Sequence, residues 1–236
     1  MIVWLVATTL ILVSGWLITP LSPQLLGRAV RRVSTREKVV ALTFDDGPSA
    51  EWTPALLDVL ARHEVPATFF VVGARVAENP ALTQRIWQAG HQVGNHSWSH
   101  TLLVGKSGTS VREEIEKTDA LLRELGYLHE IYFRAPYGCK GIVLSRLLRS
   151  LHKMHALFDV ITWDWSTPGV AEIVRRAYKA VRPGSIILLH DGGGDRAQTL
   201  QATEEIILHL KEQGYRFVTV AQLLVYDGAK VIKHSV

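Results

Sequence analysis

The sequence is poor in sulfur: its 236 residues include one cysteine, Cys139, and two methionines. A single cysteine cannot form an intramolecular disulfide bond, which excludes a small fold held together by disulfides. The same count does not distinguish an oxidising compartment from a reducing one. With 47% hydrophobic residues, the chain is long enough for one well-buried domain and barely long enough for two.

An excess of either charge is absent from most of the chain. Residues 1–38 contain five bases and one acid, namely Arg28, Arg31, Arg32, Arg36, Lys38 and Glu37. Residues 39–236 therefore hold 21 of the 26 bases and 21 of the 22 acids. A nucleic-acid-binding domain carries clustered bases on its own surface, so we expect no nucleic-acid partner. The sequence has no internal repeat and no low-complexity tract, and it indicates no obligate protein partner.

Charged side chains are also absent from the first eighteen residues, MIVWLVATTLILVSGWLI. That length is about what a bilayer span needs, and Trp4 and Trp16 lie near the two ends, where interfacial aromatic residues belong. A cleavable signal peptide would have a basic start and a small-x-small cleavage site, and neither is evident. We therefore predict that residues 1–19 form an uncleaved membrane anchor rather than a signal peptide. A buried helix of a soluble domain is the third alternative.

After this segment, strand-like and helix-like patterns alternate with a short period. The predicted strands are residues 39–44, 67–72, 91–95, 131–134, 155–162, 185–190 and 215–220. Predicted helices begin at Thr53-Pro54 and at a capping box formed by Ser110 and Glu113, and others cover residues 81–89, 170–181 and 198–213. Such alternation predicts an α/β fold with a parallel sheet and right-handed crossovers. About seven strands suit a distorted (β/α) barrel, similar to a TIM barrel, better than an open sheet.

The first strand ends in two adjacent carboxylates in the segment TFDDGPS. Neighbouring side chains of a strand point to opposite faces. Asp45 and Asp46 can therefore share one site only if the chain turns there, and Gly47-Pro48 is a suitable turn. Taken alone, the pair could equally be a solvated strand end with a helix behind it.

Polar residues also follow four later strands, in the segments GNHSWSH, FRAPYG, TWDWSTP and ILLHDGG. In a parallel barrel the carboxyl ends of the strands meet at one rim, so we expect these side chains to share a site. His96 and His100 stand four residues apart, which on one helical turn places both imidazoles on the same face. Together with a carboxylate from another strand they form a typical catalytic zinc set that leaves one position for water.

These segments, in this order and spacing, resemble the five motifs of the polysaccharide deacetylase family, also called carbohydrate esterase family four or the NodB homology domain. The resemblance covers residues 38–224. Asp164 is assigned to the fourth motif mainly because Trp165 follows it. It implies a hydrolase that removes acetyl groups from N-acetylated sugars with the help of Zn²⁺ or another divalent metal such as Co²⁺, Ni²⁺ or Mn²⁺. The implied metal ligands are Asp46, His96 and His100.

The resemblance also implies the other roles. Asp45 is the general base and Arg134 orients it. His190 is the general acid and Asp164 is its charge partner. The backbone N–H of Tyr137 stabilises the oxyanion, and Leu188 lines the pocket for the acetyl methyl. We also predict Pro136 and Trp165 as substrate contacts; Trp165 could stack on a sugar ring or equally pack in the core.

We therefore predict an N-deacetylase acting on polymers that contain N-acetylglucosamine, such as peptidoglycan, chitin-like oligomers or an exopolysaccharide. The alternatives are an O-deacetylase of the same family, acting on acetyl xylan or a wall polymer, and a non-catalytic carbohydrate-binding relative. The predicted organisation is an anchor or signal segment (1–19), a basic linker (20–36), the NodB homology domain (37–226) and a C-terminal tail (227–236).

A membrane-anchored domain outside the cytoplasm would meet such polymers, and cleavage of the segment would make the protein secreted. The bases that follow the anchor argue for the opposite orientation, since positive residues favour the cytoplasmic side.

Overall fold

The structure, a computed structural model, describes residues 29–228. The predicted anchor and most of the predicted tail lie outside the described residues, so both remain predictions. Within residues 29–228, no helix has the length and apolar character that crossing a membrane requires.

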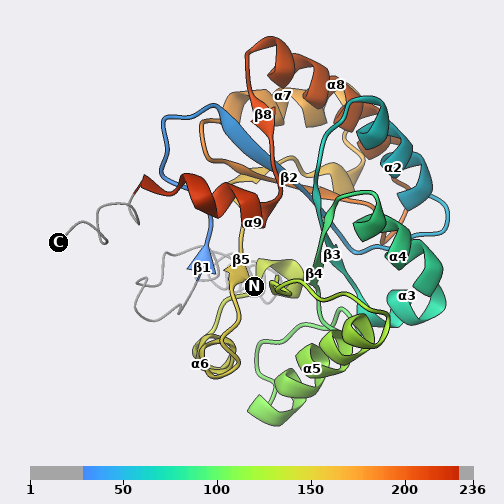
Figure 1. Cartoon of the computed structure of the whole chain (residues 1–236), viewed down its shortest axis with the longest axis vertical. Coiled ribbons are helices and arrows are strands. Elements are labelled where there is room, and N and C mark those ends of the chain that lie inside the picture. Colours follow the sequence, from blue (N-terminus) through green and yellow to red (C-terminus); the bar gives the residue numbers. More distant parts are fainter. Residues whose placement is uncertain (1–28, 229–236) are drawn as a thin grey trace, which may run out of the picture.

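A parallel sheet forms the centre of the fold, and the helices are arranged around it (Figure 1). Its strands follow the order β4-β3-β2-β7-β6, and β8 pairs with β2 outside this order. Their bounds are β2 Val39–Asp45, β3 Thr68–Val71, β4 Gln92–Asn95, β6 Val160–Ile161, β7 Ile186–His190 and β8 Arg216–Phe217. A second parallel pair joins β1 (Ala29–Val30) to β5 (His155–Ala156). The prediction of an α/β fold with a parallel sheet is confirmed.

Several strands differ from the prediction. The predicted strand 131–134 is reduced to single bridges from Phe133 to Asn95 and His155. The predicted strand 155–162 is split into β5 and β6, which pair with β1 and β7 respectively. The described pairing is therefore not the continuous ladder of a regular barrel, and closure of the barrel stays a prediction. Strand β1 was not predicted, and it places the end of the predicted linker against the domain.

The helices connect these strands. They are α2 (Thr53–Arg62), α3 (Gly73–Glu78), α4 (Pro80–Gln88), α5 (Gly108–Glu124), α6 (Ile142–Ser150), α7 (Val170–Ala180), α8 (Ala197–Glu212) and α9 (Val220–Leu223), with short 3₁₀ turns η1 (Pro136–Gly138), η2 (Asp164–Ser166) and η3 (Leu224–Tyr226). The predicted capping box at Ser110 was wrong: the N-cap of α5 is Ser107, three residues earlier, and its side chain accepts a hydrogen bond from the Ser110 N–H. Helices α3, α6 and α9 were not predicted, and they are among the shorter ones.

Strand β2 is buried along its whole length, as expected for a central strand of a parallel sheet. Its alternate residues Val40, Leu42 and Phe44 pack into the core cluster that includes apolar side chains of α2, α7 and α8. Val39 and Ala41 pack on the other face, in a separate cluster. On that second face the strand continues with Thr43 and Asp45, so this face changes from apolar to polar toward the carboxyl end of β2.

Candidate active site

The predicted residues gather at the carboxyl ends of β2, β4, β6 and β7. In the pairing of β2 with β7, Asp45 lies opposite His190. In the pairing of β3 with β4, Val71 lies opposite Asn95, the residue before His96. The chain turns at Asp46 itself, which has a left-handed φ of 72°. Both aspartates therefore stand at the same edge of the sheet.

Asp46, His96 and His100 form a group whose ligand atoms all lie within 4.8 Å of one another. Asp46 Oδ1 is 2.9 Å from His100 Nε2 and 3.5 Å from His96 Nε2. The helical turn that we expected between the histidines is absent. Instead Ser97 and His100 have φ values of 67° and 54°, and this tight turn brings the imidazoles together, with ring centroids 5.0 Å apart.

The donor atoms of this cluster suit a divalent metal. His96 Nδ1 lies 2.7 Å from the backbone oxygen of Arg134, which can only accept, so Nδ1 carries the proton and Nε2 has a free lone pair. Asp46 Oδ1 is buried and accepts no well-aligned hydrogen bond. Burial would raise the pKa of Asp46, but the hydrogen bonds and positive charge of the two histidines, when these are protonated, lower it well below its usual range. One carboxylate and two neutral imidazoles are a ligand set that zinc commonly binds.

Asp45 is held by a buried arginine. Arg134 Nη1 donates to Asp45 Oδ1 and to Thr43 Oγ1, each at 2.7 Å. The remaining donors of the guanidinium reach the backbone oxygens of Ala156 (3.1 Å) and Leu157 (3.2 Å). Because Arg134 is completely buried, its charge needs a partner, and Asp45 is that partner. The other oxygen, Asp45 Oδ2, lies 3.7 Å from His96 Nε2 and so faces the cluster.

His190 is paired with the buried Asp164. Its Nδ1 lies 2.9 Å from Asp164 Oδ1, and its backbone N–H donates to Asp164 Oδ2, also at 2.9 Å. The hydroxyls of Thr199 and Thr162 donate to the same carboxylate. Burial alone would lower the pKa of His190, but the hydrogen bond and charge of Asp164 raise it above its ordinary value. An imidazole held in this way through Nδ1 offers Nε2–H as a proton donor.

The predicted substrate contacts lie around these groups. Trp165 stands edge-on to the His190 ring with centroids 5.0 Å apart, and the Tyr137 ring stands edge-on to His100 at 4.8 Å. Pro136 is buried at the start of η1 beside Tyr137, which has a left-handed φ of 58°. Leu188 is buried on β7 and, two residues before His190, points to the same face. These positions are compatible with the predicted roles, which remain predictions.

Asp191 is a site residue that the sequence reasoning missed, although it follows His190 directly. It is buried, its Oδ2 accepts a hydrogen bond of 2.6 Å from the Thr53 hydroxyl, and its Oδ1 is unpaired. Burial, together with the nearby charges of Asp46 and Asp45, raises its pKa to about 7. Its backbone N–H donates to the backbone oxygen of Asp45 (3.1 Å), so it connects β7 to the turn that carries both aspartates.

Glu114 on α5 was also missed, since nothing in a helical sequence pattern links it to residues 97–100. Its Oε2 accepts hydrogen bonds from the backbone N–H groups of Trp98 (3.0 Å) and Ser99 (2.9 Å), and its Oε1 accepts one from the Ser99 hydroxyl (2.7 Å). The carboxylate thus fastens the strained turn between His96 and His100 to a long helix.

We expect Glu114→Ala to weaken binding of Zn²⁺ about 10-fold or more, as loss of an orienting contact behind a metal ligand commonly does. The dissociation constant is measured by competition with a chromogenic chelator. Glu116→Ala is the matched control, because Glu116 lies on the same helix but pairs with the exposed Arg112. Equal affinities in the two variants would show that Glu114 does not position the histidines.

Comparison with known proteins agrees with this geometry. The sequence profile described as polysaccharide deacetylase matches residues 32–157. A peptidoglycan-N-acetylglucosamine deacetylase of Bacillus cereus is 37% identical over 207 residues, which are 85% of this chain and 94% of that protein. A chitooligosaccharide deacetylase of Sinorhizobium fredii is 38% identical over 204 residues, covering 80% and 93% of the two chains.

A crystal structure of a peptidoglycan N-acetylglucosamine deacetylase is also similar. It superposes with a TM-score of 0.81 at 34% identity and covers 84% of this chain and 92% of that one. With these matches the chain belongs to the polysaccharide deacetylase family, and it is a hydrolase that deacetylates polysaccharides.

Proposed function

We propose that the protein is a metal-dependent N-deacetylase that releases acetate from glycans containing N-acetylglucosamine. The observation that carries the proposal is the arrangement of three groups at one sheet edge. The first group is the cluster of Asp46, His96 and His100. The second is the Asp45–Arg134 ion pair, which lies beside this cluster. The third is the His190–Asp164 pair, whose histidine lies at the end of the neighbouring strand β7. The named activities of the similar deacetylases support the same substrate class.

Amide hydrolysis needs a polarised carbonyl, an activated water and a proton for the leaving nitrogen. A divalent metal at the cluster would supply Lewis acidity and lower the pKa of a coordinated water. Asp45, oriented by Arg134, accepts a proton from the attacking water. His190 then donates its Nε2 proton to the departing nitrogen, while Asp164 holds the ring in position. The N–H of Tyr137 faces the developing oxyanion, and Leu188 contacts the acetyl methyl.

Two further parts of the proposal concern the whole chain. The uncharged residues 1–18 support a membrane anchor, and a wall polymer as substrate would require the domain to lie outside the cytoplasm. The pairing of β6 with β7 and of β5 with β1 is compatible with a distorted barrel that opens between β5 and β6.

We expect the purified full-length protein to release acetate from N-acetylglucosamine oligomers or from peptidoglycan, and to release less from acetylated xylan. A strong chelator should abolish the reaction, and adding back Zn²⁺, Co²⁺, Ni²⁺ or Mn²⁺ should restore it. Acetate is measured by a coupled enzymatic assay. Full activity in protein shown to be metal-free would contradict the proposal, and faster release from xylan would favour the O-deacetylase.

The two adjacent aspartates should behave differently when each is replaced by asparagine. Asp46→Asn removes an ionic ligand, so metal content and activity should fall together. Asp45→Asn removes the proton acceptor and leaves the ligands, so metal stays bound while kcat falls by about 10²- to 10⁴-fold. Metal content by mass spectrometry and the rate are measured on both variants. The opposite pattern would show that the two roles are exchanged.

The pH dependence should report on His190. As a general acid it acts only while protonated, so the rate falls as the pH rises through its pKa. Asp164 raises that pKa, so Asp164→Asn should move the alkaline limb of kcat/KM to lower pH. Asp58→Asn, at an exposed acid on α2, is the control and should leave the limb in place. An unmoved limb in Asp164→Asn would exclude His190 as the acid.

A further inference from the structure

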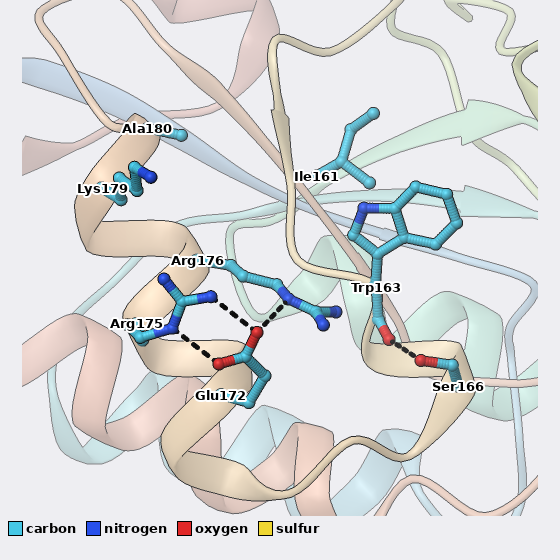
Figure 2. A pocket seen from close by; sticks show the side chains of 8 residues that line it. All are labelled: Ile161, Trp163, Ser166, Glu172, Arg175, Arg176, Lys179 and Ala180. Atoms are coloured by element: carbon cyan, nitrogen blue, oxygen red, sulfur yellow. Dashed lines mark hydrogen bonds and ion pairs between the residues drawn. The ribbon is translucent and has the colours of Figure 1, made fainter.

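A hollow of about 620 Å³ lies between the loop that carries Asp164 and helix α7, and Figure 2 shows its walls. Its lining includes Ile161, Trp163, Glu172, Arg175, Arg176 and Lys179, and we call it the tryptophan–arginine groove. None of these residues takes part in the chemistry described above.

The groove carries a local excess of positive charge. Three bases and one acid line it, which leaves a formal charge of +2, whereas residues 39–236 as a whole are neutral. Glu172 lies between two guanidinium groups (Figure 2): Arg175 bonds it through Nε (2.6 Å) and Nη2 (2.7 Å), and Arg176 through Nε (2.7 Å). Arg176 Nη1 also donates to the backbone oxygen of Thr162 (3.2 Å). One carboxylate cannot neutralise three cations, so the groove favours a second anion.

The cations are accessible. The Arg175 side chain is 59% exposed, and Lys179 is exposed at the far end of the same helix face. Glu172 holds both arginines in place before any ligand arrives, which reduces the entropy that a ligand must overcome. Glu172 engages only the Nε and Nη2 donors of Arg175, so Nη1 and the Lys179 ammonium are left to bind a second carboxylate by charge-assisted hydrogen bonds.

Two tryptophans connect the groove to the catalytic histidine. The Trp163 and Trp165 rings lie 4.9 Å apart, and Trp165 lies 5.0 Å from the His190 ring. Both indoles are partly exposed, Trp163 to 50%, and flat apolar faces of this kind suit sugar rings. A glycan with one sugar at His190 can therefore continue across Trp165 and Trp163 into the groove.

We propose that the tryptophan–arginine groove binds a carboxylate carried by a sugar of the same glycan whose acetamido group lies at His190. The inference rests on the proposed function and narrows its substrate to anionic glycans that alternate N-acetylglucosamine with a carboxylate-bearing sugar. A neutral N-acetylglucosamine oligomer would leave the excess positive charge of the groove, beyond what Glu172 neutralises, uncompensated.

Binding of two tetrasaccharides tests this inference. One is composed of N-acetylglucosamine alone, and the other alternates it with N-acetylmuramic acid. Affinities are measured by calorimetry on the full-length, metal-loaded chain carrying Asp45→Asn, which limits consumption of the ligand. We expect the anionic ligand to bind about 2- to 10-fold more tightly, because exposed ion pairs contribute modestly. Higher salt should reduce the preference.

In the same background, Arg175→Gln combined with Lys179→Gln should bring the ratio of the two affinities close to one. Arg112→Gln is the matched control, since Arg112 is an exposed, ion-paired arginine on α5, and it should keep the preference. If the double variant unfolds, Lys179→Gln alone should still lower the ratio. Equal affinities in the starting protein, or a preference that survives the double variant, would overturn the inference.

A third ligand, with a peptide joined to the lactyl carboxylate, separates two sources of the anion. Tighter binding of the free sugar acid supports the inference, whereas tighter binding of only the peptide-bearing ligand overturns it in favour of a peptide carboxylate. Absence of acetate release from every glycan would instead refute the proposed function, and the binding ratio would still report on the groove.

Discussion

The buried ion pair of Arg134 and Asp45 is the interaction on which the site depends. A guanidinium that water cannot reach must find its hydrogen-bond acceptors and an opposite charge inside the protein. Its contacts with Thr43, Asp45 and the backbone at residues 156 and 157 join β2 to the end of β5 and to the residue that follows it. Its own backbone oxygen orients His96. One residue therefore positions both Asp45, the proposed base, and His96, a proposed metal ligand, and removing it would leave Asp45 as an uncompensated buried charge.

Close packing adds a second constraint at the same place. A Cβ on Gly47 would collide with the carboxylate of Asp191, and a Cβ on Gly192 would collide with the backbone of Asp46. Arg75 also donates to the backbone oxygen of Asp46. The turn after β2 is therefore enclosed by the loop after β7, which leaves Asp46 little freedom to move away from the histidines. Glycine is required at position 47 by the close approach of the Asp191 carboxylate, and at position 192 by the close approach of the Asp46 backbone.

The sequence predicted which residues lie together at the sheet edge, but not always the backbone conformation that brings them together. Asp45 and His190 could be placed because their apolar runs, 39–44 and 185–190, predict strands whose ends share an edge in a parallel sheet. Asp164 was assigned mainly by the Trp165 that follows it, and the strand predicted before it is split in the structure. The turn between His96 and His100 could not be predicted, because its left-handed residues are held by Asn95, through the Ser97 N–H, and by the distant Glu114. The length of the strand predicted at 131–134 was also wrong. Its apolar residues are buried, which produces a strand-like pattern, but its backbone forms only single bridges at Phe133.

The packing of strand β2 also places Asp45 and Asp46 in different environments. Val39 and Ala41 pack on one face, and Val40, Leu42 and Phe44 on the other, so the strand fits the sheet in a single register. A slip by one residue would turn every side chain to the opposite face. Phe44 would then occupy the position at which Thr43 contacts Arg134. Asp45 would point to the face that packs against the helices. Two chemically identical carboxylates are thus made non-interchangeable by apolar residues at the other end of their strand. An insertion or deletion there would disable the site without touching any residue of it.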